Sequence, residues 1–364
     1  MVKDGKKSVC ILVDLLANGG TEKAASLLSI ALYNAGYKVS IICTKDNIQY
    51  EYKGKLYNLG EIKHRFALVK SLKKLIRHKK IYNQLNAHVY LDFRNRGSFF
   101  KEFILNLFIY KIEKTILTVH SHKVVNYIHP SSYFRKLYNR AKAVVVVSTG
   151  VYNKVYEMFS FNNLVYIPNF YQNNINVKSE NLLDTDVNKQ FVLAVGRLKN
   201  EVKQFDKLIL TYKNSTLYYN NVALIILGRG EDKDCLEKLI YENELQDHVK
   251  LLGFKTNPYP YIKASKFLLL SSKTEGFPMV LLESLALETP VVSFDCKSGP
   301  SEIVQNGVNG ILVKDQDFDE LTKAIDKMFL DGTFYKTCKE NSEKSVYKYS
   351  ERQVLKIWEA VINK

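Results

Sequence analysis

The sequence predicts an α/β protein of two doubly wound domains, each a parallel sheet with helices on both faces. Short apolar runs rich in β-branched residues alternate with segments of helical spacing, stop once near Pro168, and then begin again. At 364 residues the chain is long enough for two domains. Its 46% hydrophobic and 25% charged residues exclude a disordered or fibrous protein.

The first alternation occupies the first half of the chain. An apolar run at residues 8–16 predicts the first strand, and a loop with Gly19 and Gly20 follows it. Helical spacing begins at Glu22 and ends near Gly36, a residue suited to a helix C-terminus. Further strands are predicted at residues 38–44, 89–93, 115–119 and 143–148.

The second alternation follows a polar, asparagine-rich segment that we interpret as a linker. It predicts strands at residues 191–195, 222–227, 249–252, 267–270, 290–294 and 310–313. We therefore expect an N-terminal Rossmann-like domain, a linker, a C-terminal Rossmann-like domain, and a C-terminal helix that returns to the N-terminal domain. Their expected bounds are 1–170, 171–189, 190–345 and 346–364. Ligands of such sheets bind at the carboxyl ends of strands, so we expect the site in a cleft between the domains.

The excess of positive over negative charge lies entirely in the first half of the chain. Residues 1–170 hold 27 lysines and arginines against 10 acids, whereas residues 171–364 hold 26 against 27. A one-sided cationic field attracts an anionic membrane or a nucleic acid, although a lysine-rich proteome would also raise the charge. Because the basic half lacks an RNA-binding signature with interleaved aromatic residues, we expect a membrane surface and no nucleic acid as partner.

One segment of the basic half, residues 65–80, has the pattern of an amphipathic helix. Phe66, Val69, Leu72 and Ile76 fall on one helical face with Leu75, and basic residues occupy the rest. Such a helix can lie on anionic lipid, or it can pack its apolar stripe on its own domain. The sequence leaves both interpretations open.

No segment is expected to cross a membrane or to act as a secretory signal. The first apolar run contains Asp14, and the most lipid-like stretch, residues 103–110, is far shorter than the roughly 20 residues that span a bilayer. The five cysteines are scattered without metal-type spacing, so we expect reduced, structural thiols. These patterns predict a cytoplasmic protein.

The most specific pattern is the run SKTEGFPMVLLESLALETPVVSF at residues 272–294. Its loop follows a predicted strand, and Gly276 and Pro278 shape the loop before a helix begins. Glu275 belongs to the loop, whereas Glu283 lies eight residues later on the helix. Two carboxylates at this spacing can hold hydroxyls at the two ends of an extended ligand, and a helix N-terminus can bind a diphosphate.

Together with other motifs in the same order, this run resembles the E-x7-E motif of the retaining glycosyltransferase family GT4, which has the GT-B fold. Gly19–Gly20 is similar to the family's N-terminal glycine loop, and His120 to its sugar-contacting histidine. Gly196–Arg197 with Lys203 is similar to its cationic pair. The tail GPSEIVQNGVNGILV resembles bacterial members that build cell-surface polysaccharides. The resemblance covers nearly the whole chain. This sequence departs from the family's pattern at Glu288, where the family commonly has glycine. We expect this difference to have little effect on the chemistry.

The resemblance implies a role for each matched residue. Arg197 and Lys203 would clamp the donor diphosphate and stabilise the leaving group. Glu275 would orient the donor sugar, Glu283 would bind the ribose hydroxyls, and His120 would hydrogen-bond the sugar near the anomeric centre. The implied catalytic residues are Glu275, His120, Arg197 and Lys203. The implied donor-binding residues are Gly20, Gly196, Arg197, Lys203, Phe254, Gly276, Phe277, Pro278, Met279, Val280 and Glu283.

The resemblance also implies the reaction, a hexosyl transfer from a UDP-sugar that retains the α configuration. A hexose or N-acetylhexosamine would pass to a glycan acceptor, which is either an oligosaccharide or a glycan linked to a polyprenyl diphosphate at the inner membrane face. The acceptor would attack the same face of the sugar that the donor phosphate leaves, and the leaving phosphate would take the acceptor's proton. The enzyme would then bind the membrane peripherally through its basic N-terminal domain. A covalent double displacement needs two carboxyls about 5 Å apart. Eight helical residues span about 12 Å, which disfavours Glu275 and Glu283 as such a pair.

Neither a metal nor another cofactor is expected. Asp-x-Asp pairs at residues 184–186, 232–234 and 315–317 lie in polar, turn-like stretches, where we interpret them as solvated acids. The run Gly228–Arg229–Gly230 follows a strand but lacks the spacing of a nicotinamide site.

Two other functions stay open on the sequence alone. One is a sugar-nucleotide epimerase of the same fold, which would need no acceptor. The other is a non-catalytic, glycosyltransferase-like accessory subunit. Single residues also have simpler interpretations, namely a solvent-facing Glu283, a salt-bridged Arg197, and a structural His120 with His122 and His129 nearby.

Overall fold

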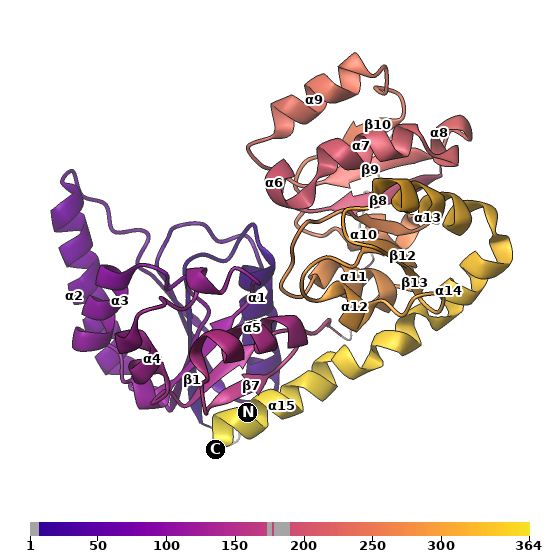
Figure 1. Ribbon diagram of the computed structural model, residues 1–364. Helices are drawn as coiled ribbons and strands as arrows, with labels where there is room; N and C mark the ends of the chain where they lie inside the picture. The colour runs from indigo at the N-terminus through magenta and orange to yellow at the C-terminus, as the bar shows by residue number, and fades with distance from the viewer. Residues whose placement is uncertain (1–6, 173–176, 178–189) are drawn as a thin grey trace. The chain divides into compact units, whose positions relative to one another are not determined.

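The computed structural model describes residues 7–172, 177 and 190–364, which form two compact units. Unit 1 extends as far as Asn169 and includes Glu351–Lys364, whereas unit 2 is Phe170–Ser350. The C-terminal helix α15 (Glu351–Asn363) therefore belongs to unit 1, where it packs against α1 (Figure 1). Unit 1 reaches Asn169 against an expected limit of 170, and unit 2 reaches Ser350 against an expected 345 but begins at Phe170 instead of residue 190. Most of the expected linker lies outside the described residues.

Unit 1 is built on a seven-stranded parallel sheet with the strand order β3-β2-β1-β4-β5-β6-β7. The strands are β1 (Ser8–Val13), β2 (Lys38–Cys43), β3 (Lys55–Asn58), β4 (Val89–Asp92), β5 (Thr115–Val119), β6 (Ala143–Val146) and β7 (Leu164–Tyr166). The helices are α1 (Gly20–Asn34), α2 (Ala67–Leu85), α3 (Phe99–Phe108), α4 (Ser132–Tyr138), α5 (Thr149–Phe159) and α15, with short 3₁₀ turns at Ile112–Lys114 and Val124–Asn126. The chain runs outward from β1 to β3 and returns to β4, so the direction of winding reverses between β1 and β4.

Unit 2 repeats this plan with six parallel strands in the order β10-β9-β8-β11-β12-β13. The strands are β8 (Phe191–Val195), β9 (Ala223–Leu227), β10 (Val249–Leu251), β11 (Leu268–Leu270), β12 (Val291–Phe294) and β13 (Gly310–Val313). The helices are α6 (Asn200–Lys203), α7 (Phe205–Lys213), α8 (Thr216–Tyr219), α9 (Lys233–Glu242), α10 (Tyr259–Ala264), α11 (Met279–Ala286), α12 (Pro300–Ile303), α13 (Phe318–Leu330) and α14 (Gly332–Val346), and a 3₁₀ turn follows at Tyr347–Tyr349. Here the winding reverses between β8 and β11.

Each predicted strand is present, in several cases shortened by one to three residues at an end. The apolar runs form strands because both faces of each sheet are covered by helices, and the central strands are almost fully buried. Sequence reasoning missed β3 and β7. Both are short edge strands with half-buried side chains: β3 begins and ends with a polar residue, and β7 is apolar but only three residues long.

The other expectations for the chain as a whole can be compared with the described residues. No helix in that part of the chain is both long and apolar enough to span a bilayer. All five cysteines are free thiols, four of them buried and Cys235 exposed.

Candidate functional site

The carboxyl edge of the unit 2 sheet gathers several of the sequence-predicted residues at its winding reversal. Arg197 and Lys203 follow β8, and Glu275 follows β11, the strand beside it. The Lys203 Nζ atom lies 2.6 Å from Glu275 Oε1, with the two side chains only 18% and 14% exposed. The tertiary structure thus joins two residues 72 positions apart in an ion pair at the place where ligands of such sheets bind.

Glycines allow this edge to pack so closely. A Cβ atom on Gly196 would lie 3.0 Å from the Lys203 side chain, and one on Gly228 would overlap the carbonyl oxygen of Gly196. Gly228 has φ +155°, which side chains rarely adopt. The short helix α6 is also tied to the loop after β11, because Ser271 Oγ donates to the Lys203 carbonyl at 2.7 Å. These contacts hold Lys203 over the β8 loop.

The loop after β11 leads into α11, which begins at Met279. The Glu275 backbone N–H donates to the Lys297 carbonyl at 3.2 Å, which ties this loop to the loop after β12. Gly276, Phe277, Pro278 and Met279 are buried and Val280 is half-buried. Free backbone N–H groups at the start of a helix favour an anion. A diphosphate or sugar hydroxyl can therefore be bound here.

Glu283 lies on α11 and is only 3% exposed, so it is not the solvent-facing carboxylate of the simpler interpretation. Tyr259 Oη donates to Glu283 Oε1 at 3.4 Å. Sequence reasoning missed Tyr259, since nothing in its local pattern marks it. The estimate of eight helical residues between Glu275 and Glu283 was wrong, because the helix begins four residues after Glu275.

Arg197 and Arg229 add positive charge at the same edge, and both side chains are exposed. Arg229 follows β9, and its guanidinium lies 4.8 Å from the centroid of the Phe254 ring, which follows β10. Sequence reasoning assigned Phe254 to the donor but not Arg229. The available signal was its position directly after a strand. Guanidinium groups beside the Lys203–Glu275 pair suit a diphosphate-linked sugar.

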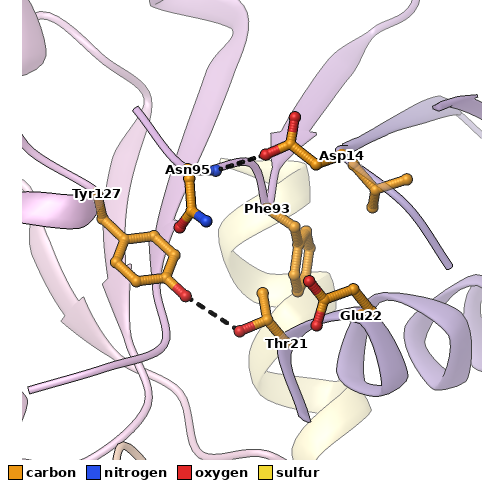
Figure 2. A pocket seen from close by; sticks show the side chains of 7 residues that line it. Asp14, Thr21, Glu22, Phe93, Asn95 and Tyr127 are labelled. Atoms are coloured by element: carbon orange, nitrogen blue, oxygen red, sulfur yellow. Dashed lines mark hydrogen bonds between the residues drawn. The ribbon is translucent and has the colours of Figure 1, made fainter. Parts of the chain in front are cut away.

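Unit 1 has a pocket at its own winding reversal, which the sequence did not predict (Figure 2). It is lined by Val13, Asp14, Thr21, Glu22, Phe93, Asn95 and Tyr127. The Asn95 backbone N–H donates to Asp14 Oδ2 at 3.1 Å, and Thr21 Oγ1 lies 3.1 Å from Tyr127 Oη (Figure 2). Polar groups from the ends of β1 and β4 and from the start of α1 therefore surround this pocket.

Gly20 is the first residue of α1, and Gly19 is its N-cap. A Cβ atom on Gly19 would collide with the Glu22 carboxylate. A side chain on Gly19 would therefore displace the Glu22 carboxylate, which lines the pocket. The role of Gly20 toward a phosphate stays a prediction.

His120 follows β5 and lies against two residues of this pocket. Its ring stacks on Phe93 with centroids 4.9 Å apart, and Tyr127 lies 6.4 Å away. Both ring nitrogens are buried, and neither has a hydrogen-bond partner in the described part of the chain. Burial, together with the nearby Arg96 charge, lowers the pKa of His120 to about 3. A neutral imidazole has one donor and one acceptor, and in His120 neither is used by the described residues. His129 is engaged instead, since its Nδ1 accepts from the Ser131 N–H at 3.2 Å.

A buried ion network lies beneath the unit 1 pocket. Arg94 contacts Asp92 at 2.8 Å and Glu102 at 3.1 Å, and all three side chains are at most 2% exposed. Arg96 donates to the carbonyls of Asp92 and Thr118 at 2.7 and 2.6 Å. Burial would raise the pKa of Asp92, but the two arginines bring it below its ordinary value. The network fixes the β4–α3 loop that carries Phe93 and Asn95.

The remaining expectations concern acids outside the site. Asp317 caps α13 by accepting from the Glu320 N–H at 3.0 Å, and the Asp184–Asp186 pair lies outside the described residues. No group of three or more potential metal ligands occurs within residues 7–172 and 190–364. Glu288 adopts φ +57°, a left-handed conformation that favours glycine, so this departure from the family pattern puts strain into the backbone.

Comparison with known proteins gives a consistent result. Residues 178–345 match the family described as glycosyl transferases group 1. The chain is 25% identical over 362 residues to the amylovoran biosynthesis glycosyltransferase AmsD of Erwinia amylovora, with 97% of this chain and 99% of the relative covered. It is 27% identical over 351 residues to the N-acetylgalactosamine-N,N'-diacetylbacillosaminyl-diphospho-undecaprenol 4-alpha-N-acetylgalactosaminyltransferase of Campylobacter jejuni, with 92% and 93% covered.

The fold is similarly matched by solved structures. Anabaena HepE, crystallised in complex with UDP and glucose, has a TM-score of 0.75 to this chain at 17% identity, with 98% of this chain and 100% of HepE covered. The two Rossmann-like units are thus those of the GT-B fold.

Proposed function

We propose that this chain, a glycosyltransferase that belongs to the glycosyl transferases group 1 family, transfers a hexose or N-acetylhexosamine from a UDP-sugar with retention of the α configuration. The proposed acceptor is a glycan carried on a polyprenyl diphosphate at the inner face of the cell membrane. The product would enter surface polysaccharide biosynthesis.

The Lys203–Glu275 ion pair is the observation that carries this proposal. Lysine has three N–H donors, so Lys203 can hold Glu275 at 2.6 Å and still donate to a diphosphate. Glu275 is then held where its second oxygen can accept from a sugar hydroxyl. With Arg197 and Arg229 on the same edge, the leaving nucleoside diphosphate would meet fixed positive charge. In this proposal the protein's own cations stabilise the diphosphate, and no metal is required.

Two relatives support the choice of donor and acceptor. The Campylobacter relative is named for a diphospho-undecaprenol-linked acceptor and an α-linkage, and HepE was crystallised with UDP and glucose. The basic unit 1 is compatible with an acceptor at an anionic membrane. His120, neutral and without a protein partner for its ring nitrogens in the described chain, fits a ligand hydroxyl.

The first test is a thermal-shift panel with UDP, GDP, ADP, CMP and their common sugar conjugates. Ligand at 100 times its dissociation constant adds about 2.7 kcal/mol to the free energy of unfolding. We expect UDP compounds alone to raise the Tm. A shift confined to another nucleotide would contradict the proposed donor.

The second test measures transfer by Glu275→Ala, with Glu288→Ala as the matched control. Glu288 forms an ion pair of the same length, 2.6 Å to Lys263, in the same unit but with both side chains about half exposed. We expect Glu275→Ala to abolish transfer while Glu288→Ala keeps it. Transfer retained by Glu275→Ala would contradict the assignment.

A further inference from the structure

Two neighbouring helices of unit 1 expose large apolar side chains. On α2 the exposed residues Leu68, Leu72 and Ile76 follow each other at four-residue spacing, so they form one row. On α3, Phe100, Ile104 and Leu107 form a second row. Their exposed fractions run from 40% for Ile104 to 86% for Leu68. We call these six residues the α2–α3 apolar surface, and Figure 1 shows the two helices side by side.

These rows are not the faces with which the helices pack on their own unit. The inward face of α2 carries Ile81 and Tyr82, and that of α3 carries Leu105, all in one buried cluster. Each helix is therefore apolar on two faces, one buried and one exposed. The sequence left open whether the apolar stripe of residues 65–80 packs on its own domain. Only Leu75 of that stripe is half-buried against the unit 1 core, and the other four side chains are exposed, so that alternative is wrong for them.

The exposed charges that α2 and α3 themselves carry are all positive. Helix α2 carries Lys70, Lys73, Lys74, Arg77, Lys79 and Lys80 and no acid. The single acid of α3, Glu102, is buried against Arg94 at 3.1 Å. An exposed apolar surface flanked by the cations of its own helices matches the interfacial zone of an anionic bilayer, where acyl chains lie directly beneath phosphate headgroups.

Other occupants fit this surface less well. A second copy of the chain would bring two rows of cations together, which repel each other. A nucleic acid would use the cations but leave six large apolar side chains without partners.

We propose that the α2–α3 apolar surface docks unit 1 on an anionic lipid bilayer, with its apolar side chains among the acyl chains and its cations at the headgroups. This inference deepens the proposed function and rests on it for the identity of the acceptor. Lys101 of α3 has its Nζ atom 3.9 Å from Asp14 Oδ1, and Asp14 lines the unit 1 pocket. The docked surface therefore adjoins a polar pocket, which would bring a lipid-borne substrate close to it.

The test is flotation with vesicles of phosphatidylcholine, with or without phosphatidylglycerol, and needs no substrate. Leu72→Gln/Leu107→Gln should raise the lipid concentration for half-binding about tenfold or more. The matched control is Leu210→Gln/Leu330→Gln, which changes two exposed leucines of unit 2. Lys73→Gln/Arg77→Gln/Lys80→Gln should lose binding about 100-fold at low salt, with less loss at high salt. Its control is Lys336→Gln/Lys339→Gln/Lys344→Gln.

The outcomes separate this inference from the proposed function. Unchanged vesicle binding by both helix variants would overturn the docking surface, and so would concentration-dependent dimers without vesicle binding. Each variant is also tested for its Tm and for the UDP-induced shift. The two proposals can also fail separately. If vesicle binding depends on these helices but no uridine nucleotide changes the Tm, the docking surface is supported and the proposed donor is contradicted.

Discussion

The Lys203–Glu275 pair gives the sharpest test of the site. Two unit charges 2.6 Å apart attract by about 6 kcal/mol at an effective dielectric constant of ~20. Desolvation offsets much of this attraction, because the side chains are only 18% and 14% exposed. We therefore expect a net coupling energy of about 2 kcal/mol between the two residues.

The assay is a double-mutant cycle with Lys203→Met, Glu275→Gln and the combined variant, followed by thermal unfolding. For a domain of this size about 2 kcal/mol corresponds to about 4–8 °C in Tm, so the double variant should lose that much less than the sum of the single losses. The control cycle is Lys263→Met with Glu288→Gln, whose 2.6 Å ion pair is 45% and 50% exposed. Because these two side chains are about half exposed, solvent screening should reduce the coupling energy between Lys263 and Glu288 to about 0–1 kcal/mol.

The same variants report on ligand binding. Lys203→Met should weaken UDP binding about 10- to 100-fold, because it removes a charge-assisted donor to phosphate. Glu275→Gln should alter UDP binding less, because its proposed ligand is the sugar. Equal coupling in both cycles, or unchanged UDP affinity in Lys203→Met, would refute the reasoning that burial and a diphosphate-binding role set this pair apart.

Two further predictions concern unit 1. Arg94→Met should lower the free energy of unfolding by about 3–5 kcal/mol, since Glu102 would stay buried without a cation and Asp92 would keep only Arg96, 3.4 Å away. Denaturant titration measures this loss, and a loss near zero would mean that the network adds no stability. For His120 the folded pKa of about 3 lies below its unfolded value of about 6.5, so the unfolded state binds the proton first and stability falls as the pH drops from about 6.5 toward 3. His120→Phe should remove up to about 1.4 kcal/mol of that loss per pH unit. The measurement is the difference in free energy of unfolding between wild type and variant across this pH range, and a difference that does not change with pH would contradict the pKa.

Much of the fold could be predicted from local pattern. Apolar runs such as residues 115–119 and 191–195 match β5 and β8 to the residue, because central strands of parallel sheets are buried on both faces. The edge strands β3 and β7 were missed, because β3 has polar residues at both ends and the three residues of β7 are too few to mark a strand. Helix α11 begins at Met279, directly after Pro278, so the residues from Glu275 to Pro278 belong to the loop and the estimate of about 12 Å for a continuous helix does not apply.

The candidate site was predictable only in part. Glu275, Arg197 and Lys203 could be named from motifs, and their roles stay predictions. Arg229 and Tyr259 could not, because each is brought to its neighbour by a strand or helix distant in sequence, and the unit 1 pocket is formed by residues from three separate segments.

The sequence by itself determined the alternation of strands and helices, the excess of cations in the first half, and the order of the motifs, because each is a local property of the chain. Only the tertiary structure decided which charges meet. The winding reversal of the unit 2 sheet brings distant loops together at one edge, where Lys203 pairs with Glu275, and the packing of α3 buries Arg94 between two carboxylates close to it in sequence. The tertiary structure also decided that the apolar row of α2 faces outward, because the opposite face of that helix already packs into the unit 1 core.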